Sequence, residues 1–82
     1  MHTDGNAIAG VLQEIFGVEV TAESRSCQSC NETWAIGAHL LYAGAGHVLR
    51  CPNCGDMAAT IIDQRGEYRV TLMGAWSVPQ AA

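Results

Sequence analysis

Near the N-terminus, apolar residues recur at positions i, i+3, i+4, i+7 and i+8, which is the spacing of one stripe on an amphipathic helix. The stripe consists of Ile8, Val11, Leu12, Ile15 and Phe16. Gly17 suits the end of this helix, because glycine adopts the left-handed conformation without steric cost. We therefore predict a helix over about residues 5–16, with Thr3, Asp4 or Asn6 as its N-terminal cap.

A helix of this length is marginal in water, so the stripe must be buried against another surface. The simpler interpretation is that it packs on the sheet of its own domain. The alternative is that it binds a groove on a partner protein or on a second copy of the chain. Under that alternative, the five stripe residues are candidate partner-binding residues.

After the helix, the pattern changes to the alternation of short strands. Strands are predicted at 18–22, 34–42, 47–50, 57–62 and 68–72, with turns at 44–46 and 64–66. The second and third of these form a hairpin. We expect a single domain over residues 1–82, with a zinc ribbon over about 18–73 and a flexible tail over about 77–82.

All four cysteines fall in two CxxC pairs, Cys27 with Cys30 and Cys51 with Cys54. Two such pairs at this separation are typical of a zinc site, because four thiolates complete a tetrahedron around the ion. The residues after each pair favour the tight turn that a shared ion requires. Asn31 and Gly55 both tolerate a positive φ, and Pro52 presets the entry to the second turn.

Other uses of the cysteines stay open. An iron ion in the same four-cysteine site would make the protein rubredoxin-like, and a thiol switch or disulfides would use the cysteines as redox groups. His39 and His47 lie between the pairs and are alternative ligands, although four cysteines already suffice. A closed shell of four thiolates predicts one structural Zn²⁺ per chain rather than a catalytic one.

Charge argues against nucleic acid as the partner. The 82 residues include no lysine and only four arginines, against eight acidic residues, for a formal charge of −4. Binding a phosphate backbone requires clustered positive charge, and Arg65 with Arg69 is the one candidate patch. No apolar run is long enough to span a membrane, and no signal peptide is recognisable, so we expect a cytoplasmic protein.

A core built from so few residues is marginal without a further constraint, and the metal supplies it. The predicted fold class is therefore a small metal-stabilised α+β domain. It has an N-terminal helix followed by a zinc ribbon of β-hairpins with two CxxC knuckles. We expect the metal-free chain to be largely unfolded.

Several segments resemble a family of small uncharacterised bacterial zinc-ribbon proteins, found chiefly in actinobacteria. They are residues 4–10, residues 15–22, the first CxxC pair, residues 48–55 and the Leu-Met-Gly element at 72–74. The resemblance implies Cys27, Cys30, Cys51 and Cys54 as metal ligands and implies no catalytic residue. It also suggests a redox enzyme as partner, since members are encoded near flavin-dependent and molybdenum-dependent oxidoreductases.

No nucleophile or acid–base constellation stands out, because Asp56 and Asp63 are typical of solvated surface carboxylates. We therefore expect no enzyme activity. The leading hypothesis is a structural zinc module that acts through protein–protein interaction, using the helix or the hairpin with Trp34 and Tyr42. The alternatives are a nucleic-acid-binding zinc ribbon and a rubredoxin-like or thiol-switch redox protein.

Overall fold

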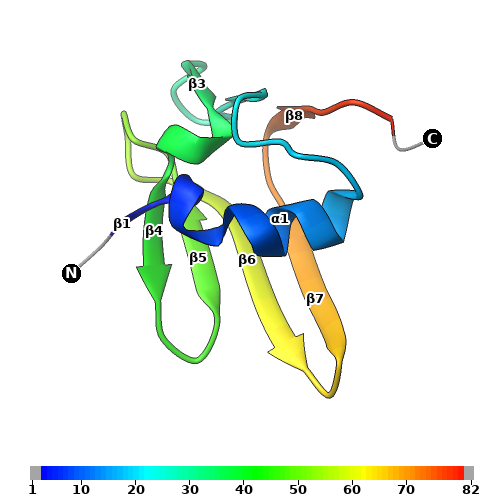
Figure 1. The fold of residues 1–82 in the computed structure, drawn as a ribbon. Coiled ribbons are helices and arrows are strands. Elements are labelled where there is room, and N and C mark those ends of the chain that lie inside the picture. The colour runs from blue at the N-terminus through cyan, green and yellow to red at the C-terminus, as the bar shows by residue number, and fades with distance from the viewer. Residues whose placement is uncertain (1–2, 81–82) are drawn as a thin grey trace.

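The fold combines one helical segment with two small antiparallel sheets (Figure 1). The computed structural model describes residues 3–80. A 3-10 turn, η1 (Gly5–Ile8), leads into helix α1 (Ala9–Phe16), and a second 3-10 turn, η2 (Ile36–Ala38), lies between two strands. The strands are β1 (Thr3–Asp4), β2 (Ser24–Ser26), β3 (Thr33–Ala35), β4 (Leu40–Ala43), β5 (His47–Arg50), β6 (Met57–Gln64), β7 (Glu67–Leu72) and β8 (Ala75–Ser77).

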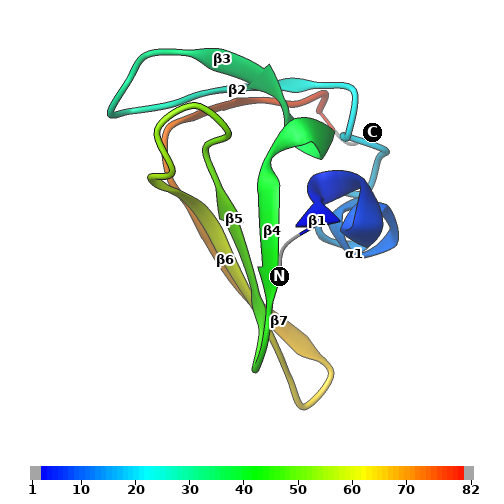
Figure 2. The same ribbon diagram turned by 90° about the vertical axis from the view of Figure 1, so that its left-hand side faces the viewer.

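The strands divide into a larger sheet of order β1-β4-β5-β6-β7 and a smaller sheet of order β3-β2-β8. Every neighbouring pair is antiparallel. The smaller sheet lies across one end of the larger one, and α1 lies against one face of the larger sheet (Figure 2). In the part of the chain that the structure describes, no helix is both long and apolar enough to cross a membrane.

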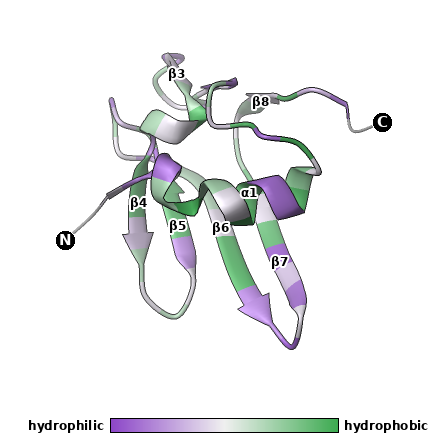
Figure 3. Ribbon diagram, in the orientation of Figure 1, coloured by the Kyte–Doolittle hydropathy of each residue, from purple (hydrophilic) through white to green (hydrophobic). Residues whose placement is uncertain are grey.

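The hydrophobic core lies between α1 and the larger sheet. Figure 3 shows β6 as mainly hydrophobic until it turns hydrophilic near the turn into β7, and β5 as hydrophilic toward the β4–β5 turn. Burying apolar side chains is the main favourable contribution to the folding of a domain. The buried members of the core are Ile8, Leu12, Val20, Ile36, Leu41, Leu49, Ala58, Ala59 and Ile61.

The predicted helical stripe meets this core. Ile8 and Leu12 are buried in it, and Val11, Ile15 and Phe16 pack against it. The chain's own core therefore covers Ile8 and Leu12, which corrects the alternative prediction that these two residues bind a partner. For the half-buried Val11, Ile15 and Phe16, partner binding stays a prediction. The helix ends as predicted, because Gly17 has φ 78° and its N–H donates to Gln13 O at 2.8 Å.

The start of the predicted helix is a 3-10 turn rather than an α-helix. Of the three candidate caps, Asp4 is the one that acts, since its side chain accepts a hydrogen bond from Asn6 N at 3.1 Å. Gly5 N donates to His39 O at 2.9 Å. This bond ties the entry of the segment to the chain just before β4.

The strand predicted over residues 18–22 is wrong. Val20 is buried, but no residue of this range is in a strand, and Thr21 and Ala22 form a turn. The Glu19 carboxylate accepts hydrogen bonds from the backbone N–H and the hydroxyl of Thr21, and Glu23 N donates to Val20 O. Local bonds of this kind compete with a sheet ladder and hold the chain in a turn.

The continuous strand predicted over residues 34–42 is also wrong, because η2 interrupts it. Ile36 N donates to Glu23 O at 2.7 Å and Gly37 N donates to Thr21 O at 2.9 Å, so this turn is pinned to the loop before β2. Strand β3 consequently pairs with β2 in the smaller sheet, whereas β4 pairs with β5 in the larger one.

The C-terminal segment contributes a strand that the sequence does not predict. Strand β8 pairs with β2, and Trp76 lies opposite Arg25. Of the tail predicted over 77–82, Ser77 belongs to β8 and Val78 packs against the core. Positions 81 and 82 lie outside the described residues.

Candidate metal centre

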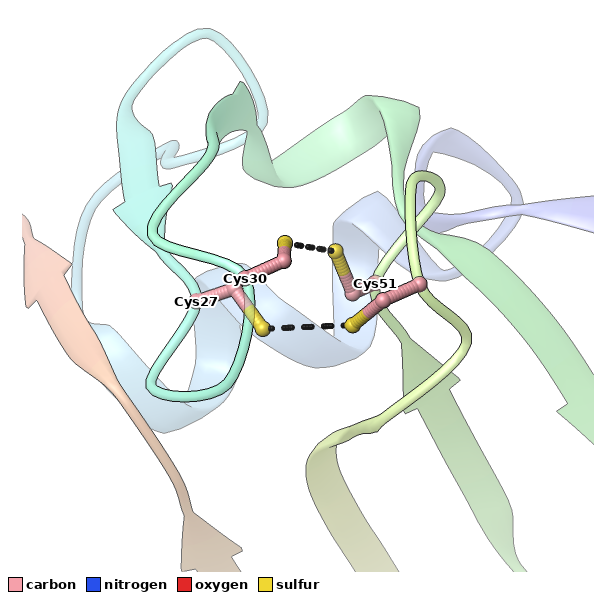
Figure 4. Close-up of side chains that lie close together, drawn as sticks. Cys27, Cys30 and Cys51 are labelled. Carbon is pink, nitrogen blue, oxygen red and sulfur yellow. Dashed lines mark hydrogen bonds between the residues drawn. The ribbon is translucent and has the colours of Figure 1, made fainter.

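The two CxxC segments occupy corresponding loops of the two sheets. Cys27 and Cys30 lie in the loop that joins β2 to β3 in the smaller sheet. Cys51 and Cys54 lie in the loop that joins β5 to β6 in the larger sheet. Figure 4 shows the sulfur atoms of the two loops facing each other. The cysteine cluster therefore lies where the two sheets meet.

The two loops share one backbone design. In each, the carbonyl of the first cysteine accepts a hydrogen bond from the residue four positions later. The N–H of the first cysteine donates to the carbonyl of the residue five positions later. The four N···O distances of these bonds in the two loops lie between 2.8 and 3.1 Å. Asn31 has φ 63° and Gly55 has φ 79°, which confirms the predicted left-handed residue after each pair. This conformation reverses the chain directly after the second sulfur.

The sulfur positions fit a tetrahedral metal ion. Cys27 Sγ lies 3.6 Å from Cys54 Sγ, and Cys30 Sγ lies 3.7 Å from Cys51 Sγ. All four sulfurs lie within 4.8 Å of one another. A tetrahedron with Zn–S bonds of about 2.3 Å has S···S edges of about 3.8 Å, whereas a disulfide requires about 2.05 Å. The four thiols are free, and the distances of 3.6 and 3.7 Å match the spacing of a metal-bound tetrahedron.

Hydrogen bonds lower the pKa of two of the thiols. The backbone N–H groups of Cys30 and Ser29 stabilise the Cys27 thiolate and lower the pKa of Cys27 to about 6. The side-chain amide of Asn53 is the main cause of the lowered pKa of Cys30. Metals bind the deprotonated sulfur, so these donors favour the form that a cation needs.

The pKa of Cys54 shifts in the opposite direction. The backbone N–H of Asp56 lowers the pKa of Cys54. Partial desolvation of the sulfur and the thiol hydrogen bonds with the other three cysteines outweigh that effect and raise the pKa to about 12. Four negative charges at this spacing repel one another strongly, and a divalent cation removes the penalty.

Polar side chains tie the two loops together beside the sulfurs. Gln28 Nε2 donates to Asp56 Oδ2 at 2.8 Å and to Met57 O at 3.2 Å, and the Ser29 hydroxyl donates to the same Asp56 oxygen. The Ser29 hydrogen bond is the first cause of the lowered pKa of Asp56. Asp56 is therefore a structural carboxylate that bridges the loops, rather than the solvated charge that the sequence predicts.

A buried arginine extends this network into the domain. Arg25 has only 1% of its surface exposed, and its guanidinium donates to Met73 O at 2.8 Å and to Gln28 Oε1 at 2.7 Å. Its Nη1 lies 3.3 Å from His39 Nε2. Because a guanidinium has no acceptor atom, His39 Nε2 must accept the hydrogen bond from Arg25. The Nδ1–H of His39 then donates to Ala35 O at 2.9 Å.

These contacts give His39 a structural role. Both of its ring nitrogens already have partners other than metal, and the group of possible metal ligands within residues 3–80 contains cysteines alone. His47 is likewise outside that group. Arg50, like Arg25, bonds to backbone near the cysteines, since its Nη1 donates to Gly55 O at 3.0 Å. The sequence did not predict the bridging roles of Gln28, Ser29 and Asp56, because these roles depend on contacts between the two cysteine loops.

The fold and the cysteine cluster define a small α+β domain with a tetracysteine site that is able to hold a metal ion. The chain belongs to a family of unknown function, DUF6510, whose model matches residues 1–81. Searches of curated proteins and of solved structures give no match.

Proposed function

We propose that this chain is a non-enzymatic module that folds around one structural zinc ion and acts by binding another protein. The observation that supports it best is the cluster of four thiols at tetrahedral spacing. Four protein ligands fill the coordination shell of zinc and leave no position for water or substrate. In this proposal the two CxxC turns are the knuckles of a zinc ribbon, and reducing cytoplasm keeps the thiols available for the metal.

Metal analysis tests the zinc assignment. The chain would be produced in medium containing both zinc and iron, purified without oxygen, and measured by plasma mass spectrometry and visible absorption. We expect about one zinc per chain and no colour, since Zn²⁺ has a filled d shell. A coloured protein with one iron per chain would replace this proposal with a rubredoxin-like one.

Affinity capture tests the protein-binding part. The zinc-loaded chain would serve as bait in an extract of its native host, with a four-serine variant of the cysteines as the matched control. We expect a defined protein that the folded bait retains and the control loses. An oxidoreductase is the partner that the family resemblance suggests. Failure to retain any protein selectively would count against an interaction module.

A second candidate is a thiol switch, favoured by the exposure of Cys54 among otherwise more buried cysteines. Peroxide would oxidise an accessible thiolate to a sulfenic acid, which condenses with a neighbouring thiol to a disulfide, and the metal would leave. A zinc indicator dye would report the release. Zinc released by mild peroxide and rebound after dithiothreitol would support this candidate, whereas zinc retention would exclude it.

A further inference from the structure

The larger sheet has a second face, which points away from the core. Across β4 to β7, Tyr42, Val48, Thr60 and Thr71 lie opposite one another. The neighbouring row contains the buried Leu41, Leu49 and Ala59. Because alternate residues of a strand point to opposite faces, the first row faces away from α1. Among the described residues, no element covers this side of β4 to β7 below the smaller sheet (Figure 2).

This surface, the outer face, combines apolar side chains with arginines. We define it by Tyr42, Val48, Arg50, Thr60, Ile62 and Arg69. Tyr42 keeps 37% of its surface exposed and Ile62 keeps 45%, and both belong to the few large exposed hydrophobics of the domain. The Arg50 guanidinium lies 5.8 Å from the centre of the Tyr42 ring, and Arg69 lies opposite Ile62 across the β6–β7 pair.

A hollow deepens one end of the outer face. It has a volume of about 450 Å³ and lies beside the tip of the β4–β5 hairpin, and its lining includes residues 43–47 of the tip together with Tyr42, Val48 and Ile62. Gly46 lies close to β6, since a Cβ there would be 2.7 Å from Ile61 O. The hollow is large enough for one bulky apolar side chain, and its lining includes Val48, Thr60 and Ile62 of the outer face.

The charges of the domain are divided between its sides. Arg25 is buried, and the other three cations are Arg50 and Arg69 on the outer face and Arg65 in the turn between β6 and β7. Glu67, opposite Gln64, is the acidic residue of β7 that shares this face. The remaining acids lie on β1, the helix and its following loop, the cysteine loops and the helix side of β6: Asp4, Glu14, Glu19, Glu23, Glu32, Asp56 and Asp63.

We propose that the outer face is the docking surface for an acidic segment of a partner protein, with an apolar side chain of that segment seated in the hollow. The inference rests on the proposed function and names its partner class. Charge complementarity supports it, because an anionic segment on this face meets Arg50 and Arg69, with Arg65 in the adjoining turn, and avoids all the acidic residues except Glu67. The apolar hollow supplies the central anchor that protein interfaces use.

A second copy of the chain fits this surface less well. A symmetric dimer through the outer face would place two arginine-bearing surfaces against each other, and like charges at an interface are unfavourable. An asymmetric pairing of the outer face with the acidic helix side would balance the charges. That contact would leave both surfaces open on the end molecules and would build a chain rather than a closed dimer.

Nucleic acid also fits less well. Three arginines neutralise few phosphates, and the chain as a whole carries a charge of −4 before the thiolates are counted. Tyr42 is the one aromatic side chain in our definition of the face, whereas surfaces that bind single strands stack successive bases on several aromatics. The aliphatic part of the hollow matches a protein side chain better than a base.

Selection from a random peptide library tests the proposal. The zinc-loaded full chain would be biotinylated at its terminal amine, which is the one reactive amine because the chain has no lysine. Peptides retained by it would be sequenced and measured against Arg69→Gln and Ile62→Thr. These positions are exposed and lie away from the cysteines, so both variants should fold. Gln13→Glu on α1 makes the same change in net charge as Arg69→Gln and is the matched control.

We expect selected peptides to combine acidic residues with one large apolar residue. Arg69→Gln and Ile62→Thr should each weaken their binding by about ten-fold, and Gln13→Glu by less than about two-fold. Binding should change the NMR chemical shifts of backbone amides in β4 to β7. Peptides without acidic enrichment, or equal binding by the wild type and both outer-face variants, would overturn the proposal. Salt-dependent binding of a fluorescent single-stranded DNA that Arg69→Gln weakens would replace it with nucleic-acid binding.

Zinc content measured on the same samples distinguishes failure of the docking proposal from failure of the proposed zinc module. A zinc-loaded, folded chain that selects no acidic peptide refutes the docking surface and leaves the zinc module standing. A folded chain that contains no zinc but selects acidic peptides refutes the zinc module and leaves the docking surface standing.

Discussion

Gly55 and Asn31 set the backbone conformation on which the two cysteine turns depend. Both have a positive φ, which side chains other than glycine adopt at a cost of about 1–2 kcal/mol. Asn31 tolerates this conformation better than most residues, and Gly55 has no penalty. The same chain reversal is thus available at both turns.

Replacing Gly55 with alanine should isolate this backbone effect. A Cβ at Gly55 meets no atom within 4 Å, so any loss of stability arises from the left-handed conformation alone. We expect the zinc-loaded Gly55→Ala variant to be less stable by about 1 kcal/mol in urea unfolding. Gly44→Ala is the control, because that position is equally open and does not have a positive φ. Equal effects at the two sites would contradict the explanation.

Arg25 donates hydrogen bonds to backbone carbonyls and to side chains inside the domain. Its guanidinium bonds to Met73 O and Met57 O as well as to Gln28 and His39. Arg25→Met should fill similar space but remove the donor to His39 Nε2 and Gln28 Oε1, and an unpaired buried acceptor costs about 1–3 kcal/mol. We expect a loss of at least about 2 kcal/mol by urea unfolding of the zinc-loaded protein. Arg69→Met, at an exposed position, should change stability by less than about 0.5 kcal/mol.

His39 should make stability depend on pH. Burial is the main cause of its lowered pKa, and the charge of Arg25 lowers it further. Below about pH 6.5 the unfolded chain therefore binds a proton that the folded chain does not, so stability falls as the pH falls. His39→Gln should show a shallower loss of unfolding free energy between about pH 7 and pH 5.5, measured with excess zinc at every pH. Parallel curves for the two proteins would refute this origin of the slope.

At the scale of elements, β8 closes the smaller sheet and carries an aromatic contact to the helix. The Trp76 ring stacks on Phe16 of α1 with centroids 5.8 Å apart, and its Nε1 donates to Met73 O at 3.0 Å. Trp34, on the opposite edge strand β3, leaves 39% of its surface exposed. The two tryptophans therefore contribute unequally to the packing between the smaller sheet and α1.

Removing each indole should reveal this difference. Trp76→Ala loses the stacking on Phe16 and part of the packing over α1, and we expect it to destabilise the zinc-loaded protein by about 2–3 kcal/mol. Trp34→Ala should cost less than about 1 kcal/mol. Thermal unfolding of the two variants would be followed by circular dichroism, because this signal does not depend on which tryptophan remains. A larger loss for Trp34→Ala would contradict the assigned roles.

At the scale of the whole molecule, the cysteine cluster joins the two sheets. Each sheet supplies one pair of sulfurs, and the Gln28, Ser29 and Asp56 bridge connects the same two loops. A structural zinc site contributes roughly 10 kcal/mol or more, which is comparable with the total stability of a small domain. The metal and the core should therefore be lost together.

Chelation tests this coupling. Excess EDTA added to the zinc-loaded chain should abolish the far-ultraviolet signal of the sheets and the native tryptophan fluorescence in one coincident step. Adding zinc back under reducing conditions should restore both. A chelated chain that kept its native circular dichroism would show that the hydrophobic core folds without the ion.

The sequence by itself determined the features that depend on neighbouring residues. Helical spacing identified the stripe that packs on the core, and the CxxC pairs identified the cysteines that come together. The residues after each pair predicted the positive φ of Asn31 and Gly55. Each of these rests on rules of local spacing or backbone sterics, which do not depend on the rest of the fold.

Only the tertiary structure decided how the strands divide into sheets. Turn η2 directs β3 and β4 into different sheets because Ile36 and Gly37 bond to carbonyls of Glu23 and Thr21, and β8 pairs with β2 from the far end of the chain. Contacts between distant segments likewise gave Arg25 its buried partners and left the outer face uncovered. No local pattern encodes such contacts, because they depend on which apolar faces of distant elements pack together in the core.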